Sequence, residues 1–186
     1  MESRTALFRI TTIGSIVLLI DQLTKAWIRT NIPLYGAIYP IPEAASFFRL
    51  THLTNTGVAF GFLQGASMLY LLIVSVILMA VVLYARHLPW HLPAVQIAAG
   101  LQLGGALGNL IDRVHQGYVT DFLDFYMSIG GKVYHYPPFN LADSAIVVGV
   151  GLLMVILWRE EGKNKRVQSE SPEQESEVIT WAERAE

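Results

Sequence analysis

The stretch Met68–Tyr84 reads MLYLLIVSVILMAVVLY and contains no charged residue. A helix needs about 17–25 mostly apolar residues to cross a bilayer core that is roughly 30 Å thick, so this stretch is long enough for one crossing. Three more apolar stretches have a similar length: Phe8–Trp27, Pro93–Ile111 and Leu141–Trp158. We therefore predict an all-α membrane protein with four transmembrane helices, formed by residues 1–160.

The composition agrees with a membrane protein. Of 186 residues, 53% are hydrophobic and only 15% are charged, whereas a soluble domain needs more charge to cover its surface. The net charge of −2 gives no reason to expect a nucleic-acid partner. The chain has no cysteine, which excludes disulfides, thiolate nucleophiles and cysteine-bound metals. No small-x-small cleavage motif follows the first apolar run, so we expect an uncleaved first helix rather than a removed signal peptide.

Basic residues predict the orientation. They precede the first span and follow the second and fourth spans, as Arg4, Arg9, Arg86, Arg159, Lys163, Lys165 and Arg166. The positive-inside rule places these segments, and so both termini, in the cytoplasm. Two loops then lie outside, Ile28–Ser67 and Asp112–Asn140. The first contains a predicted β element, with strands Phe47–Thr54 and Val58–Phe62 around a turn.

Three features have purely structural interpretations. Gly100, Gly104 and Gly108 form a small-residue stripe on the third span, and Ala145 and Gly149 form one on the fourth, which favours close helix packing. The third span also carries Gln96, Gln102 and Asn109, so one of its sides is expected to face protein or water. Residues 161–186 are rich in Glu, Ser and Gln, and we predict a disordered cytoplasmic tail.

Ionisable residues near membrane depth are functional candidates by default. Four groups of polar residues fall on the predicted outer side. They are Asp21 with Lys25, Asn109 with Asp112 and Arg113, Asp121 with its neighbour Asp124, and Asn140 with Asp143.

Each group also has a simpler explanation. Asp21 and Lys25 can form an i,i+4 ion pair, Arg113 can complement a helix dipole, and Asp143 can be a first-turn helix acid. Spacing alone does not choose between Asp121 and Asp124.

The convergence of these groups favours chemistry. Two carboxylates in a partly dry site share one proton near neutral pH, which suits acid–base hydrolysis of an amide. The chain has no His-Glu-x-x-His zinc motif and no Gly-x-Ser-x-Gly motif. A proton-coupled transporter is the alternative, but it would need acids spread through the membrane depth. A non-enzymatic scaffold would need no polar convergence.

Five ordered motifs, on residues 14 to 158, resemble the lipoprotein signal peptidase family, also called signal peptidase II. They are Asp21-Gln22-x-x-Lys25, Asn55-Thr56-Gly57-Val58-Ala59-Phe60, Gly108-Asn109-Leu110-Ile111-Asp112-Arg113, Gly117-x-Val119-x-Asp121-Phe122 and Phe139-Asn140-x-Ala142-Asp143. The stretch between Asp121 and Asn140 looks longer than is usual in this family.

The resemblance implies that Asp121 and Asp143 are catalytic and that Asp124 is secondary. It also implies substrate-binding or supporting roles for Asn55, Gly57, Asn109, Arg113, Asn140, Ala142, Asp21 and Lys25, without metal or cofactor. Members of this family remove signal peptides from diacylglyceryl-modified prolipoproteins, on the amino side of the lipidated cysteine. They act at the outer face of the bacterial inner membrane, among its lipids, and are inhibited by globomycin.

Overall fold

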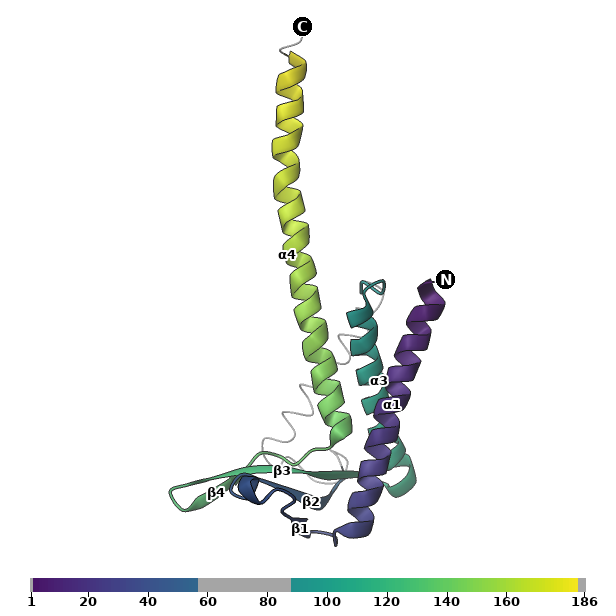
Figure 1. Ribbon diagram of the computed structural model, residues 1–186, viewed down its shortest axis with the longest axis vertical. Coiled ribbons are helices and arrows are strands. Elements are labelled where there is room, and N and C mark those ends of the chain that lie inside the picture. Colours follow the sequence, from purple (N-terminus) through teal and green to yellow (C-terminus); the bar gives the residue numbers. More distant parts are fainter. Residues whose placement is uncertain (1, 57–87, 184–186) are drawn as a thin grey trace.

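A computed structural model describes residues 2–56 and 88–183, with side chains described for 4–56 and 88–163 (Figure 1). It is mostly helical, with one small antiparallel sheet. Its long helices are α1 (Glu2–Asn31), α3 (Pro93–Gln116) and α4 (Leu141–Glu183). Three segments of these helices are long and apolar enough to cross a membrane, namely Arg4–Asn31, Pro93–Gln116 and Leu141–Lys163. The predicted span Met68–Tyr84 lies outside the described residues.

The helices extend beyond the predicted spans. Helix α1 continues past Trp27, and α3 continues past Ile111 until Gly117, which adopts the left-handed conformation (φ 79°) and donates its N–H to the Arg113 carbonyl oxygen at 3.1 Å. Glycine is the usual residue at such a helix end because it has no Cβ to clash. Asp21, Lys25 and Asn109 therefore lie inside helices rather than at their ends, whereas Arg113 is in the last turn of α3.

The tail differs from its prediction. Residues 161–183 continue α4 as a helix, where the sequence predicted disorder. Glu, Gln, Lys and Arg have good helix propensity although they cannot form a core. A Lys163–Glu160 ion pair of 2.7 Å, one turn apart, adds support near the point where the apolar part ends.

Helix α3 lies against both α1 and α4 (Figure 1). A Cβ at Gly104 would lie 2.5 Å from the Gly14 carbonyl oxygen, and one at Gly149 would lie 2.8 Å from the Ala98 carbonyl oxygen. The prediction of close helix packing at these glycines is confirmed. Gln96 and Gln102 of α3 are buried, as expected for a helix that faces protein.

The sheet has the strand order β1 (Ala37–Ile38), β2 (Phe48–Asn55), β3 (Val119–Ile129), β4 (Lys132–His135), with every neighbouring pair antiparallel. A 3-10 turn, Pro42–Ala44, connects β1 to β2. The predicted strand Phe47–Thr54 is confirmed as β2, whereas the predicted strand Val58–Phe62 lies outside the described residues. Strands β3 and β4 were not predicted, because the sequence of β3 does not alternate cleanly between polar and apolar residues.

The sheet lies across one end of the helices, beside the start of α4 and the ends of α1 and α3, while the N-terminus and the far end of α4 lie on the opposite side (Figure 1). Phe122 of β3 packs in a buried cluster with Ile28 of α1 and with Ile32, the residue that follows α1. This contact fixes β3 against α1. The Phe122 and Leu123 N–H groups donate to the Phe139 carbonyl oxygen, and these bonds bring the segment around Asp121 next to the first turn of α4.

Candidate functional site

Asp121 is buried on β3, where both of its carboxylate oxygens accept hydrogen bonds. Asn55 of β2 donates its Nδ2–H to Oδ2 at 2.9 Å, and Asn140 donates its Nδ2–H to Oδ1 at 2.7 Å. The antiparallel register, which pairs Asn55 with Val119 and Leu53 with Asp121, places Asn55 within reach. The carboxylate is thus held in one orientation by amides from two different segments.

Asp143 lies in the first turn of α4, and Asn140 caps that helix. The Asn140 Oδ1 accepts the Asp143 N–H at 3.0 Å, and Asp143 Oδ2 accepts the Asn140 N–H at 3.3 Å. This reciprocal pair is the capping-box arrangement of a helix N-terminus. Asn109 of α3 donates its Nδ2–H to the other oxygen, Oδ1, at 2.8 Å. The first-turn role and the candidate site role of Asp143 therefore coexist in one geometry.

Asn140 connects the two aspartates through its side chain. Its amide atom near the Asp143 N–H must be the oxygen, because only the oxygen accepts a hydrogen bond. The amide nitrogen is then turned to Asp121, so one residue fixes both carboxyl groups. Asn140 is fully buried, which leaves its amide no alternative partner in bulk water.

The electrostatics of Asp121 follow from this burial. Removal from water, and then the nearby charge of Asp143, raise the pKa of Asp121 to about 7, against the opposing hydrogen bonds from Asn55 and Asn140 and the charge of Lys25. A carboxyl group with this pKa holds its proton at pH values at which an ordinary aspartate has lost it. Asp121 can therefore serve as a proton donor near neutral pH.

Lys25 organises the polar residues behind the pair. It is fully buried, and its Nζ lies 2.8 Å from Asp21 Oδ2, 3.1 Å from Asp112 Oδ2 and 3.0 Å from Asn109 Oδ1. An ammonium group has three hydrogens and no acceptor. The Asn109 atom that faces it must therefore be the oxygen, which turns the Asn109 amide nitrogen towards Asp143.

Asp21 connects α1 to the start of α4. Its Oδ1 accepts the Ala142 N–H at 3.0 Å. A Cβ at Gly108 would lie 2.5 Å from Asp21 Oδ2, so this glycine of α3 makes room for the carboxylate. The sequence interpreted Asp21 with Lys25 as an ion pair at a helix end; the ion pair is present, but it is completely buried and shared among three helices.

The remaining predicted residues differ in their positions. Arg113 is exposed, and its Nη1 donates to the Asn109 carbonyl oxygen at 3.4 Å. Gly57 lies outside the described residues. Asp112, which the sequence placed among the polar residues of the outer side without a role of its own, is buried and accepts the Thr120 N–H at 3.2 Å. In the sequence, the signal that could have identified Asp112 was its position in the Gly108–Arg113 motif, which also contains Asn109.

Asp124, the rival of Asp121, has a different environment. Arg49 Nε donates to Asp124 Oδ2 at 2.7 Å, and His135 Nδ1 lies 2.8 Å from Asp124 Oδ1. These contacts connect β3 to β2 and β4, and they do not involve Asn140. The geometry therefore separates Asp124 from the pair formed by Asp121 and Asp143.

Asp124→Asn is expected to lower any activity that depends on Asp121 and Asp143 less than about tenfold, because it removes a charge from a contact whose partners Arg49 and His135 are partly exposed and can be resolvated. The measurement is the activity of the purified variant, compared with that of an Asp121 variant. A loss of activity as large as that of an Asp121 variant would contradict this separation.

Within the described ranges, no group of three or more His, Asp or Glu side chains is arranged to hold a metal ion. The fold and the site define a membrane protein with two amide-bound aspartates at one end of its helices, Asp121 buried and Asp143 partly buried, an arrangement that suits an aspartic peptidase. A family model described as "Signal peptidase (SPase) II" matches residues 13–159. The chain belongs to the signal peptidase II family, and it is an aspartic peptidase.

Individual relatives agree with this assignment. A protein of Geobacter sulfurreducens named lipoprotein signal peptidase is 44% identical over 166 residues, which cover 87% of this chain and 97% of the relative. A protein of Shewanella amazonensis with the same name is 35% identical over 83% of this chain and 90% of the relative. A solved structure described as a bacterial membrane enzyme is 34% identical, covers 86% of this chain and 90% of its own, and superimposes with a TM-score of 0.60.

Proposed function

We propose that this membrane peptidase removes signal peptides from diacylglyceryl-modified prolipoproteins and cuts on the amino side of the lipidated cysteine. The relatives named lipoprotein signal peptidase support the substrate class. The observation that carries the proposal is the contact of Asn140 with both Asp121 and Asp143, at 2.7 Å and 3.0 Å. Asn140 donates to the Asp121 carboxylate from its side-chain amide and to the Asp143 carboxylate from its backbone N–H. Two carboxyl groups held by one residue in this way are suited to act on one water and one peptide bond, without a cofactor.

The pair would work by acid–base catalysis with one shared proton. The ionised aspartate takes a proton from water as the water oxygen attacks the peptide carbonyl carbon, while the protonated aspartate gives its proton to the carbonyl oxygen. When the tetrahedral intermediate collapses, the first aspartate passes its proton to the leaving nitrogen and the C–N bond breaks. The second aspartate regains a proton from the intermediate's hydroxyl, which restores the starting state.

The supporting residues would divide into two roles. Asn55, Asn109 and Asn140 hold the carboxyl groups of the pair, and Asp21 and Lys25 hold Asn109 and the start of α4. We assign contacts with the substrate backbone to Gly57 and Arg113. Ala142, which is fully buried and donates its N–H to Asp21, has a supporting role.

We also propose that the chain crosses the bacterial inner membrane four times, with Met68–Tyr84 as the additional span, both termini in the cytoplasm and the site at the outer face. The placement of the site at one end of the helices, opposite the basic N-terminus, supports this topology. A site at the bilayer boundary can receive a diacylglyceryl group sideways from the membrane lipids. Globomycin would inhibit the enzyme by occupying the same site, and the tail of residues 161–186 would have no catalytic role.

The direct test uses the purified chain in lipid vesicles with a synthetic peptide that carries a diacylglyceryl-modified cysteine. Mass spectrometry should find cleavage immediately before that cysteine, and globomycin should block it. The matched control is the same peptide with an unmodified cysteine, which should be cleaved much more slowly. Equal cleavage of both peptides would contradict the proposed substrate class.

The pH dependence of cleavage is expected to show a decline above about pH 7, the pKa of Asp121. Below this pH the pair retains the proton that it needs as an acid, and above it both carboxyl groups ionise. The raised pKa moves this limb upward from the acidic range of an ordinary aspartate. The measurement is kcat/KM from about pH 5 to about pH 9. A decline centred near pH 4 would contradict the shared proton.

A further inference from the structure

Asp121 lies between two anchored residues of β3. Side chains alternate along a strand, so Thr120 and Phe122 lie on the face opposite Asp121. Phe122 packs against Ile28 of α1 in the apolar cluster, but apolar packing is not directional. Thr120 is fully buried, and its hydrogen bonds are therefore the contacts that can fix the direction of the strand beside Asp121.

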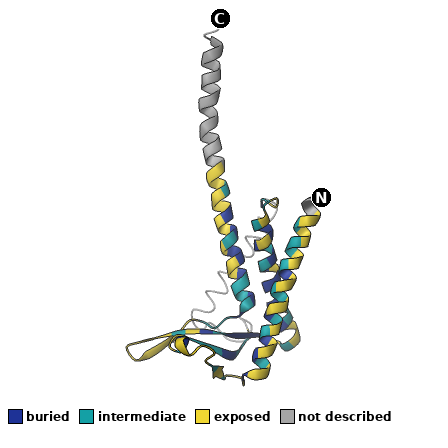
Figure 2. Cartoon of the chain, in the orientation of Figure 1, coloured by how far each residue is buried: buried dark blue, intermediate teal, exposed yellow. Residues whose placement is uncertain are grey.

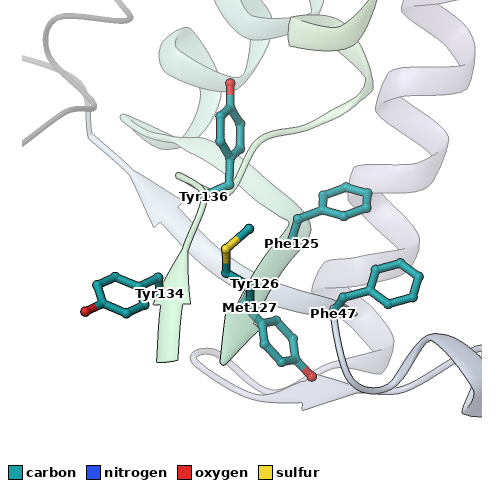
Figure 3. Close-up of a pocket in the computed structure, with 6 residues that line it drawn as sticks. All are labelled: Phe47, Phe125, Tyr126, Met127, Tyr134 and Tyr136. Carbon is teal, nitrogen blue, oxygen red and sulfur yellow. The ribbon is translucent and has the colours of Figure 1, made fainter. Parts of the chain in front are cut away.

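The far half of β3 is more open than its start. Met127 and Ile129 are exposed by 58% and 59%, and Figure 2 shows β3 buried beside the helices but exposed along the hairpin. An apolar hollow of about 230 Å³ borders this half (Figure 3), and its lining residues are Phe47, Phe125, Tyr126, Met127, Tyr134 and Tyr136. Side chains beside a hollow lack contacts on one side. The position of Asp121 is therefore set at the start of β3.

Three contacts hold Thr120 there. Arg29 of α1 donates its Nη1–H to Thr120 Oγ1 at 3.2 Å, and Gln116, the last residue of α3, donates its Nε2–H to the same oxygen at 3.3 Å. The Thr120 N–H donates to Asp112 Oδ2 at 3.2 Å. A hydroxyl oxygen has two lone pairs, so the two donors use its full capacity as an acceptor. The residue before Asp121 is thus fixed through its side chain and its backbone.

Arg29 also reaches the polar residues behind Asp143. Its Nη1 lies 3.8 Å from Asp112 Oδ1, and Asp112 shares the ammonium group of Lys25 with Asn109. Asn109 in turn donates to Asp143. One guanidinium group therefore connects β3 to the residues that hold the second aspartate. Arginine suits such a junction because its planar group carries several N–H donors in fixed directions.

We propose that Arg29 is a positioning residue for the aspartate pair, acting through Thr120 and Asp112 rather than by contact with the substrate. It fixes the start of β3 against α1 and α3, and with it the direction in which the Asp121 carboxyl group points. The side chain of Arg29 is 27% exposed, and the residue lies outside the five motifs that resemble the family. This role rests on the proposed peptidase function and adds a residue to it.

The first test is a double-mutant cycle on cleavage of the diacylglyceryl peptide. Arg29→Met removes the donor, and Thr120→Val removes the acceptor with little change of shape. Each single variant is expected to lower kcat about tenfold with KM nearly unchanged, and the double variant should be no slower, because either change breaks the same contact. Thr120→Ser keeps the hydroxyl group and should restore kcat.

The matched control is Arg49→Met, which removes an arginine of similar exposure, 30%, from the buried Asp124 of the same strand. Its effect should add to that of Thr120→Val without coupling. Additive losses for Arg29→Met and Thr120→Val would overturn the proposal, as would a Thr120→Ser variant as slow as Thr120→Val. A raised KM with unchanged kcat in Arg29→Met would indicate contact with the substrate and would also overturn it.

A second readout needs no substrate and separates this proposal from the peptidase function. Infrared spectra of the full-length protein are recorded at about pH 6, below the pKa of Asp121. The carbonyl stretching band of the protonated Asp121 is the band that Asp121→Asn removes, and its frequency depends on the hydrogen bonds of the carboxyl group. We expect Arg29→Met to shift this band and Arg49→Met to leave it in place. An unshifted band in Arg29→Met would overturn the proposal, whether or not the unmodified protein cleaves the peptide.

Discussion

Asp121→Asn and Asp143→Asn are each expected to reduce cleavage of a lipid-modified precursor by at least about 10²- to 10⁴-fold, the contribution of a positioned acid or base. Asparagine has nearly the shape of aspartate but can neither take a proton from water nor give one to a carbonyl oxygen. Because it keeps one acceptor oxygen, each variant retains part of the hydrogen bonding from Asn55, Asn109 and Asn140. The measurement is the single-turnover rate with a diacylglyceryl peptide.

The control for this prediction is Asp124→Asn, which makes the same chemical change three residues further along β3. All three variants should have the elution volume and the circular dichroism of the unmodified protein, so that a loss of activity reports on chemistry rather than folding. Turnover close to that of the unmodified protein in either Asp121→Asn or Asp143→Asn would exclude the pair as the catalytic groups. It would leave the family membership intact.

The sequence predicted the structure best in segments whose residue types have a single physical explanation. The apolar spans, the glycines of α3 and the strand Phe48–Asn55 are of this kind, and the structure confirms them within the described residues. The helix ends were predicted less well. A charge such as Asp21 normally marks the end of a span, but here Lys25 of the same helix and the Ala142 N–H of α4 stabilise it in a buried position. The spacing predicted the contact with Lys25, whereas no local pattern reveals the contact with α4.

The prediction of the site was likewise successful for some features and not for others. The motifs named Asp121, Asp143 and the three asparagines, but spacing alone did not show that Asn140 contacts both aspartates, because this contact depends on β3 lying next to the start of α4. Asp112 was underestimated for the same reason. Its role depends on Lys25, which lies far away along the chain. Long-range pairing of polar groups is set by tertiary packing, which one sequence without its fold does not reveal.

Lys25→Met is expected to lower the free energy of unfolding by about 3–5 kcal/mol, the usual cost of removing one partner from a buried ion pair. Methionine can fill much of the space of the lysine stem, so the loss comes from charge and hydrogen bonding rather than from a cavity. Asp21 and Asp112 would remain buried beside it, without the ammonium group that now lies 2.8 Å and 3.1 Å from their oxygens. The measurement is thermal or denaturant unfolding of the purified protein in detergent.

The matched control is Lys163→Met, which removes a lysine from an ion pair of similar length, 2.7 Å, on the exposed part of α4. Exposed pairs contribute little to stability, so this variant should unfold like the unmodified protein. Similar losses in the two variants would contradict the role of burial. A double variant, Lys25→Met with Asp21→Asn, should recover part of the stability because it removes one of the stranded charges.

Lys25 should also affect the chemistry, and this separates a positioning role from a purely structural one. Its positive charge lowers the pKa of Asp121, and its hydrogen bond turns the Asn109 amide towards Asp143. In the folded fraction of the double variant, the pKa of Asp121 should therefore rise, because the ionised form loses a stabilising charge. The alkaline limb of kcat/KM should move to higher pH while kcat falls. A limb that stays in place would mean that Lys25 supports the fold without acting on the pair.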